Sequence, residues 1–292
     1  AQRDDERTQR NLVKTNAPVI HADESHRQHK RNGDAHHQAR AKINVILFVP
    51  GLFARPLVES KADKADHQNN QDGLDQHAHK LVDGCGDGRR EEPGDDLVSV
   101  LAHAEMTDEE GQTHRLSDDE ITAFSTLLLA AGSGTTWKQM GITLIALLTN
   151  PGVLDEIRAD RSLLKPAIEE SLRWEPTDPM FSRFATSDTE IAGVSVPEGS
   201  VVHLCLGAAN RDPARWERPD EYDITRPPTS AMGFGSGPHI CLGMHVARAE
   251  IVTGISALLD RLPNLRLDPA AEPPQLIGMY ERGATEINVL WD

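Results

Sequence analysis

The sequence is poor in the residues that mark several classes of protein. Only 3 of its 292 residues are cysteines and 4% are aromatic. Cys85, Cys205 and Cys241 form no close pair, which argues against a disulfide framework or a zinc knuckle. No unbroken apolar stretch reaches the ~18 residues of a membrane helix, and the chain starts at Ala1 without a signal pattern. We therefore expect a protein of the reducing cytoplasm with no membrane partner.

Positive charge is scarce over most of the chain. The net charge is −16, and residues 1–90 contain 15 Lys and Arg against 13 Asp and Glu, which leaves 15 against 33 in residues 91–292. So acidic a body repels phosphates, and we expect no nucleic-acid partner.

The first 92 residues differ from the rest. Eight of the 13 histidines lie there, and apolar periodicity is poor outside residues 43–53. A segment this polar buries too little apolar area to offset its ordering entropy, so residues 1–92 are predicted to be an atypical, disordered or poorly packed segment. A metal site is the weaker alternative, because the spacings match no ligand pattern. Its histidines would be His36, His37, His77 and His79.

From residue 93 onward the pattern is that of a domain that is mainly α with a small β component. Ser117 and Glu120 have the spacing of a capping box ahead of a long helix. A Pro-, Arg- and Asp-rich stretch over residues 207–233 predicts an ordered loop. Helices are predicted over residues 118–148, 152–158, 164–174 and 242–262, and strands over 190–196 and 201–206.

The strongest chemical pattern is the segment from Phe234 to Gly243, which reads Phe-Gly-Ser-Gly-Pro-His-Ile-Cys-Leu-Gly. Gly235 and Gly237 allow a tight backbone turn close to a flat ligand. Cys241 is expected at the N-terminus of the following helix, where the helix dipole favours a thiolate, a good soft ligand for iron. The alternative is a small buried cysteine beside an ordinary turn.

This segment matches Phe-Gly-x-Gly-x-His-x-Cys-x-Gly at all six defined places, and so resembles the haem-binding motif of the cytochrome P-450 family. The resemblance covers residues 93–292 and implies the C-terminal half of the cytochrome P-450 fold, incomplete in this chain. It implies haem b as cofactor, with Cys241 as the ligand to the haem iron. It assigns further haem contacts to Arg183, at a propionate, and to Phe234, Gly235, Gly237, His239 and Gly243.

Glu170 and Arg173 resemble the family's Glu-x-x-Arg pair, which implies a structural ion pair on one helix face. The family adds a basic partner from a later segment. Here Glu221 stands where an arginine is usual, and Arg218 or Arg226 could substitute.

Residues 131–136, Ala-Gly-Ser-Gly-Thr-Thr, resemble the oxygen-binding stretch of the family's long helix. The resemblance implies catalytic roles for Gly134, Thr135 and Thr136, with Thr135 holding bound oxygen and water. The family carries an acid where this chain has Gly134, so protons would pass through Ser133, water or a substrate hydroxyl. A helix with small packing residues is the alternative.

The resemblance implies a haem-thiolate monooxygenase that inserts one atom of O2 into a small apolar substrate. NAD(P)H would supply electrons through a reductase and a ferredoxin, and the chain would act as a monomer. A truncated, inactive remnant and a peroxide-dependent haem-thiolate enzyme are the alternatives. Residues of the substrate wall, or else of ordinary core packing, would be Phe124, Leu128, Thr177, Met180, Phe181 and Met279.

Overall fold

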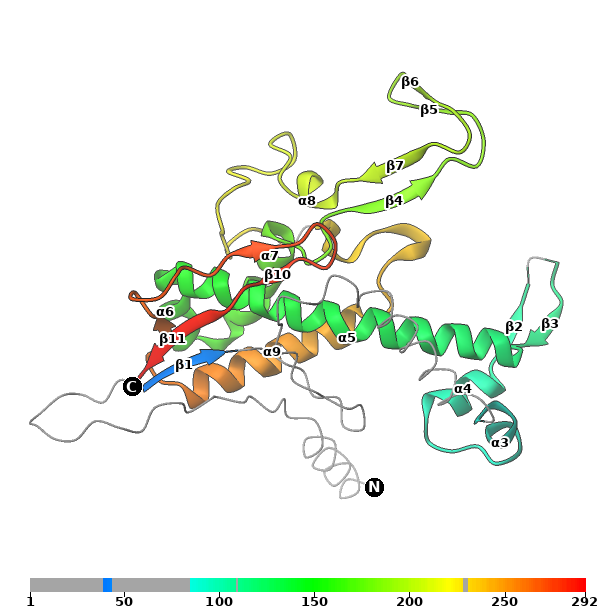
Figure 1. Cartoon of the computed structure of the whole chain (residues 1–292), viewed down its shortest axis with the longest axis horizontal. Helices are drawn as coiled ribbons and strands as arrows, with labels where there is room; N and C mark the ends of the chain where they lie inside the picture. The colour runs from blue at the N-terminus through cyan, green and yellow to red at the C-terminus, as the bar shows by residue number, and fades with distance from the viewer. Residues whose placement is uncertain (1–38, 44–84, 109, 228–230) are drawn as a thin grey trace, which may run out of the picture. The chain divides into compact units, whose positions relative to one another are not determined.

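The computed structural model of the chain describes residues 39–43, 85–108, 110–227 and 231–292 (Figure 1). The chain divides into two compact units, one of residues 1–50 and 134–292 and the other of residues 51–133. The four histidines of the metal-site alternative and most of the segment 1–92 lie outside the described residues. Within that segment the structure describes strand β1 (Ala39–Ile43) and most of helix α3 (Cys85–Glu91) with the residues that follow it.

Helix α5 (Asp118–Thr149) is continuous over 32 residues, one residue longer than predicted. The predicted capping box is present: the Glu120 backbone N–H donates to Ser117 Oγ (3.3 Å), and the Ser117 N–H donates to Glu120 Oε2 (2.8 Å). The pKa of the Glu120 carboxyl is lowered by that backbone hydrogen bond. Asn150 ends the helix, and Pro151 begins the next one.

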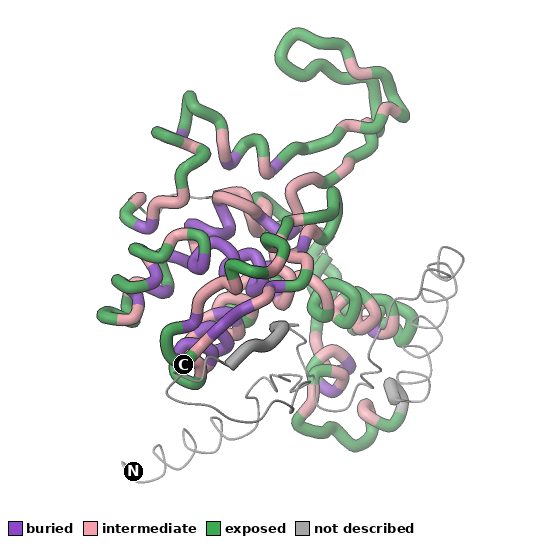
Figure 2. The backbone as a smooth tube through the Cα atoms, turned by 60° about the vertical axis from the view of Figure 1, so that its left-hand side comes forward, coloured by how far each residue is buried: buried purple, intermediate pink, exposed green. Residues whose placement is uncertain are grey.

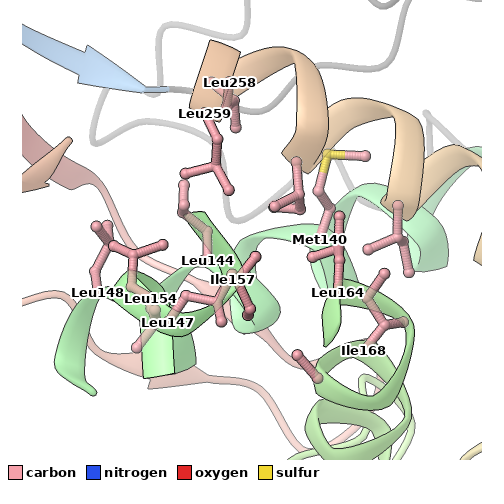
Figure 3. Close-up of a cluster of buried hydrophobic side chains, with 14 of the residues drawn as sticks. Met140, Leu144, Leu147, Leu148, Leu154, Ile157, Leu164, Ile168, Leu258 and Leu259 are labelled. Atoms are coloured by element: carbon pink, nitrogen blue, oxygen red, sulfur yellow. The ribbon is translucent and has the colours of Figure 1, made fainter. Parts of the chain in front are cut away.

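The core of the first unit is built by four helices. Helices α6 (Pro151–Ala159) and α7 (Leu164–Trp174) and the C-terminal half of α5 contribute buried leucines and isoleucines, and α9 (Met244–Arg261) adds Ile251, Ile255 and Leu258 (Figures 2 and 3). The short 3-10 helix η2 (Arg161–Leu163) joins α6 to α7. A Cβ on Gly254 would lie 2.6 Å from the Met140 side chain, so α9 packs closely on α5 through this glycine.

Strands complete the first unit without forming a large sheet. Strand β11 (Ile287–Trp291) pairs antiparallel with β1 on one side and with β8 (Arg266–Leu267) on the other (Figure 1). Val289 on β11 is fully buried and closes one side of the core. Strands β9 (Leu276–Ile277) and β10 (Gly283–Ala284) form a short hairpin.

The predicted β region is a long hairpin with two paired stretches. Strand β4 (Phe181–Phe184) pairs with β7 (Val201–Leu204), and β5 (Thr189–Ile191) with β6 (Val194–Val196), where a turn at Gly193 separates the two inner strands. The prediction of one strand over residues 190–196 is therefore wrong, because Ala192 and Gly193 take positive φ and reverse the chain.

The predicted loop 207–233 contains two short helical turns at its ends, α8 (Leu206–Ala209) and η3 (Met232–Phe234). A further turn, η4 (Gly237–His239), lies just before Cys241. Among the described residues, no single helix is long and apolar enough to cross a membrane. Helices α5 and α6 pass that test only when taken together, and they bend by 101° at their junction.

The second unit contains α3, α4 (Leu97–His103) and the hairpin of β2 (Glu105–Thr107) with β3 (Thr113–Arg115). Ala102 and Ile121 are fully buried and form a small separate core. Arg90 crosslinks the unit by donating to the Leu116 carbonyl (2.6 Å) and to Asp118 (2.9 Å).

The substitution Ile255→Ala tests the core of the first unit. Because Ile255 is fully buried, the free energy of unfolding should fall by about 2–5 kcal/mol in urea titration. Ile191→Ala is the control: that side chain is 49% exposed and its removal should cost about 0.5 kcal/mol or less. Equal losses in the two variants would contradict the assigned core.

Candidate functional site

The segment around Cys241 forms a closed loop rather than an extended strand. The Cys241 backbone N–H donates to the Phe234 carbonyl (2.9 Å), and the Ile240 N–H donates to the Gly237 carbonyl (3.0 Å). Gly235 and Gly237 have φ of 71° and 72°. A side chain would strain the backbone at both positions, so the loop depends on its two glycines.

Cys241 lies farther from the helix than predicted. Helix α9 begins at Met244, two residues later than expected, and Gly243 is its N-cap residue. The prediction that Cys241 sits at the helix N-terminus is therefore wrong by three residues, because the hydrogen bond to Phe234 keeps the cysteine in the loop. The first helical bond runs from the Ala247 N–H to the Gly243 carbonyl (2.9 Å).

A fixed cation accompanies the thiol. Arg248, on the second turn of α9, donates to Glu169 Oε2 (2.9 Å), and its guanidinium lies 4.6 Å from the centroid of the Phe234 ring. The hydrogen bond to Glu169 raises the pKa of Arg248, and attraction to Cys241 raises it further. Arg248 was not singled out from the sequence, and it holds Phe234 and α7 to the helix that follows the cysteine.

Apolar side chains around Cys241 are open to solvent. Ile240 is 49% exposed, Leu242 72% and Val246 62%. These three side chains are close in sequence to the partly exposed Cys241, and covering exposed apolar side chains with a flat apolar group would be favourable. A sulfur donor in an apolar, glycine-lined setting fits the haem that the motif implies.

The remaining predicted haem contacts lie on the surface. His239 ends the turn η4 and is exposed. Arg183 on β4 is exposed and donates to the carbonyl of its neighbour Ser182 (2.9 Å). The haem contact of His239 and the contact of Arg183 with a haem propionate stay predictions. Among the described residues, no group of three or more His, Cys, Asp and Glu side chains could hold a metal ion.

Glu170 and Arg173 form a buried salt bridge. Two nitrogens of Arg173 donate to the two oxygens of Glu170, at 2.8 and 2.7 Å, and the side chains are 2% and 5% exposed for Arg173 and Glu170. The third member is Arg226, whose Nε donates to Glu170 Oε1 at 3.1 Å. Arg218, the other candidate, pairs instead with Glu221 and Asp223 on the surface.

This network fixes residues 210–227 and Met232, which precede the cysteine loop. Arg173 also donates to the carbonyls of Asn210 (3.0 Å) and Pro219 (2.7 Å). Asn210, which is 1% exposed, accepts from the Met232 N–H at 2.7 Å just before the loop. Sequence reasoning missed Asn210, because a lone asparagine in a polar stretch carries no pattern.

The predicted oxygen-binding stretch lies on α5. Ser133 Oγ bonds back to the Ala130 carbonyl (3.4 Å), and Thr136 is 7% exposed. Gly134 and Thr135 are half-buried. The carboxylate of Glu281, which the sequence did not single out, lies next to Gly134. The Glu281 backbone N–H donates to Asp178 Oδ1 (3.0 Å).

The predicted substrate-wall residues do not all fall in one unit. Phe124 and Leu128 belong to the second unit, and the other four belong to the first. Thr177 is buried and donates to the Arg282 carbonyl (2.7 Å), whereas Met279 is 64% exposed.

Comparison with known proteins agrees with this geometry. The model of the family described as Cytochrome P450 matches residues 41–278, so the chain belongs to the cytochrome P450 family. The match starts well before residue 93, where the resemblance drawn from motifs begins. The chain is 44% identical over 210 residues to Cytochrome P450 105C1 of a Streptomyces species, which covers 70% of this chain and 52% of that protein.

Solved structures show the same fold. HmtT, involved in himastatin biosynthesis, is similar with a TM-score of 0.68 and 36% identity, over 81% of this chain and 58% of that one. CYP109E1 from Bacillus megaterium in complex with testosterone has a TM-score of 0.67 and 31% identity, over 77% and 60%. The fold is that of a partial cytochrome P450, as predicted, and the chain spans about half the length of the curated relatives it matches.

Arg226→Ala should destabilise the protein, because it removes a charged hydrogen bond from the buried Glu170. We expect a loss of about 1.5–3 kcal/mol in the free energy of unfolding by urea titration. Arg218→Ala, on an arginine 55% exposed at its side chain, should cost about 1 kcal/mol or less. If Arg218→Ala loses more free energy of unfolding than Arg226→Ala, Arg226 is not the third member of the Glu170 and Arg173 network.

Asp178→Asn should stabilise the protein in a pH-dependent way. Burial raises the pKa of the Asp178 carboxyl and outweighs the lowering by the hydrogen bond from the Glu281 backbone N–H, while the negative charge of Glu281 raises the pKa further. The folded state therefore disfavours ionisation of Asp178. As a result, the free energy of unfolding falls as pH rises from the ordinary aspartate pKa of about 4 through the raised pKa. The gain of the variant over the parent should appear in urea titrations at neutral pH and vanish near pH 3. A gain independent of pH would contradict this.

Proposed function

We propose that this chain is the haem-binding part of a haem-thiolate monooxygenase. The observation that carries the proposal is the glycine-dependent loop that presents Cys241 beside Ile240, Leu242 and Val246. When bound there, a haem b held by the Cys241 sulfur would supply the activation of O2. Phe234, Gly235, Gly237 and Gly243 would shape the loop against it, while Arg183 and His239 would bind its propionates.

The residues of α5 have a different task. The small side chains around Gly134 leave room next to the helix, and the Thr135 hydroxyl would hold a proton for delivery to oxygen. Thr136 is buried and would fix the helix face that carries Thr135. The cysteine loop and the part of α5 from Gly134 onward belong to the first unit, and Phe234 of the loop packs against the core of that unit.

Electron donors and substrate complete the proposal. NAD(P)H would supply two electrons through a ferredoxin reductase and a ferredoxin, in the cytoplasm, where Cys205 and Cys241 would stay reduced. A small apolar substrate is supported by the exposed apolar side chains of the site and by relatives solved with testosterone and with a hexadecenoic acid on its acyl carrier protein.

A carbon monoxide difference spectrum of the reduced chain, reconstituted with hemin, tests the ligand. We expect a thiolate-type Soret band in the parent and its complete loss in Cys241→Ala, because the substitution removes the proposed sulfur ligand. Cys205→Ala is the matched control and should keep the band. A band that survives in Cys241→Ala would overturn the ligand assignment.

The same preparation separates the alternatives. A parent that takes up no hemin, or binds it only through histidine, would favour the inactive remnant. Turnover with hydrogen peroxide but not with ferredoxin, reductase and NADH would replace the proposed electron path by a peroxide-dependent one.

A further inference from the structure

The carboxylate of Glu281 occupies the space that a side chain at position 134 would enter. A Cβ atom on Gly134 would lie 2.9 Å from Glu281 Oε2. The same oxygen accepts a hydrogen bond from the Lys138 ammonium, one helical turn further along α5. Glu281 is therefore held against the turn of α5 that contains Gly134 and Thr135, although Glu281 is far from that turn in the sequence.

Glycines on both sides allow this approach. A Cβ on Gly283 would lie 3.1 Å from Lys138 Cγ, and one on Gly141 would lie 3.3 Å from the Ala284 Cβ. Gly134, Lys138 and Gly141 follow one another on a single face of α5. The β10 segment can thus lie directly on the helix and bring Glu281 to Gly134.

The backbone at Glu281 is held in an unfavourable conformation. Its φ is +48°, in the left-handed region that favours glycine. The Glu281 N–H donates to Asp178 (3.0 Å) and the Arg282 N–H donates to the Thr177 carbonyl (2.6 Å), which together fix this conformation. Strain of this kind persists where the surroundings over-determine the backbone, and it is frequent at functional sites.

The position also suits proton transfer between solvent and the helix. The Glu281 side chain is 49% exposed, whereas that of Lys138 is 19% exposed. The Glu281 carboxylate is therefore accessible to water while it lies against α5 at Gly134, the residue before Thr135. The proposed reaction consumes substrate, one O2, two electrons from NADH and two protons, and it yields substrate carrying one inserted oxygen atom and one water. Gly134 itself has no group that could carry those protons.

We propose that Glu281, held by Lys138 beside Gly134, takes protons from solvent and passes them to the Thr135 hydroxyl, directly or through one water. This relay rests on the proposed function. In each transfer the Glu281 carboxyl loses a proton to the threonine side and regains one from bulk water, so no other reactant is needed. The charged groups around it are Lys138 on α5, Asp178 before β4 and Arg282, which pairs with Glu175.

A double-mutant cycle tests the placement without any cofactor. Gly134→Asp should add a second carboxylate at the Glu281 oxygen, and like charges at that distance repel. We expect Gly134→Asp to lower the folding equilibrium constant about tenfold more in the parent than in the Glu281→Gln background. The measurement is urea unfolding of the full chain. An equal effect in both backgrounds would overturn the placement.

NADH-driven oxygen uptake by the hemin-loaded chain, with added ferredoxin and reductase, tests the relay. Glu281→Gln should slow uptake about 100-fold and raise its solvent isotope effect in D2O, since an acid in the path is lost. Gly134→Asp combined with Glu281→Gln should restore rate and isotope effect, because the carboxyl returns to the same space on another residue. Glu272→Gln, an exposed glutamate, is the matched control and should change neither.

The outcomes separate the relay from the function on which it rests. If the parent shows the thiolate-type band and oxygen uptake, and Glu281→Gln keeps the parent's rate and isotope effect, the relay is overturned and the proposed function stands. A parent without the band or without oxygen uptake overturns the proposed function and the relay with it.

Discussion

The buried ion pair between Glu170 and Arg173 is the interaction on which the rest of the first unit depends. Two charges taken out of water are tolerable only when every polar atom is paired. Here Arg226 donates a further hydrogen bond to the Glu170 carboxylate. The guanidinium of Arg173 also donates to three backbone carbonyls, those of Asn210, Pro219 and Glu221. Those carbonyls belong to the stretch that leads to the cysteine loop. The pair thereby fixes a long irregular segment that has little secondary structure of its own.

Close packing against α5 is the second constraint on the site. Gly254 lets α9 approach near Met140, and Gly283 lets the β10 hairpin lie against Lys138. Both contacts fall on the buried C-terminal half of α5. The small-residue stretch of residues 131–136 lies at the N-terminal edge of that buried half. The cysteine loop, the part of α5 from Gly134 onward and Glu281 all belong to the first unit, although they come from distant parts of the sequence.

Features set by interactions between residues close in sequence were predicted correctly, whereas features set by contacts within loops and turns were not. Helices α5, α6 and α7 were predicted within one or two residues, because caps, prolines and apolar periodicity act within a few residues of the chain. The start of α9 was misplaced, because the hydrogen bond between Cys241 and Phe234 belongs to a loop that periodicity does not encode. The prediction of a strand over residues 190–196 was wrong at Ala192, because alanine has no preference for the positive φ that it takes there.

The sequence by itself determined the family, the cysteine and glycines of its loop, and the Glu170 and Arg173 pair, since each is a short pattern of residue types. Only the tertiary structure decided which arginine completes that pair, and that Asn210 and Arg248 support the loop. It also decided that a carboxylate lies beside Gly134. The physical reason is that these contacts join segments dozens of residues apart or more, and the packing of helices, not local spacing, sets the distance between them.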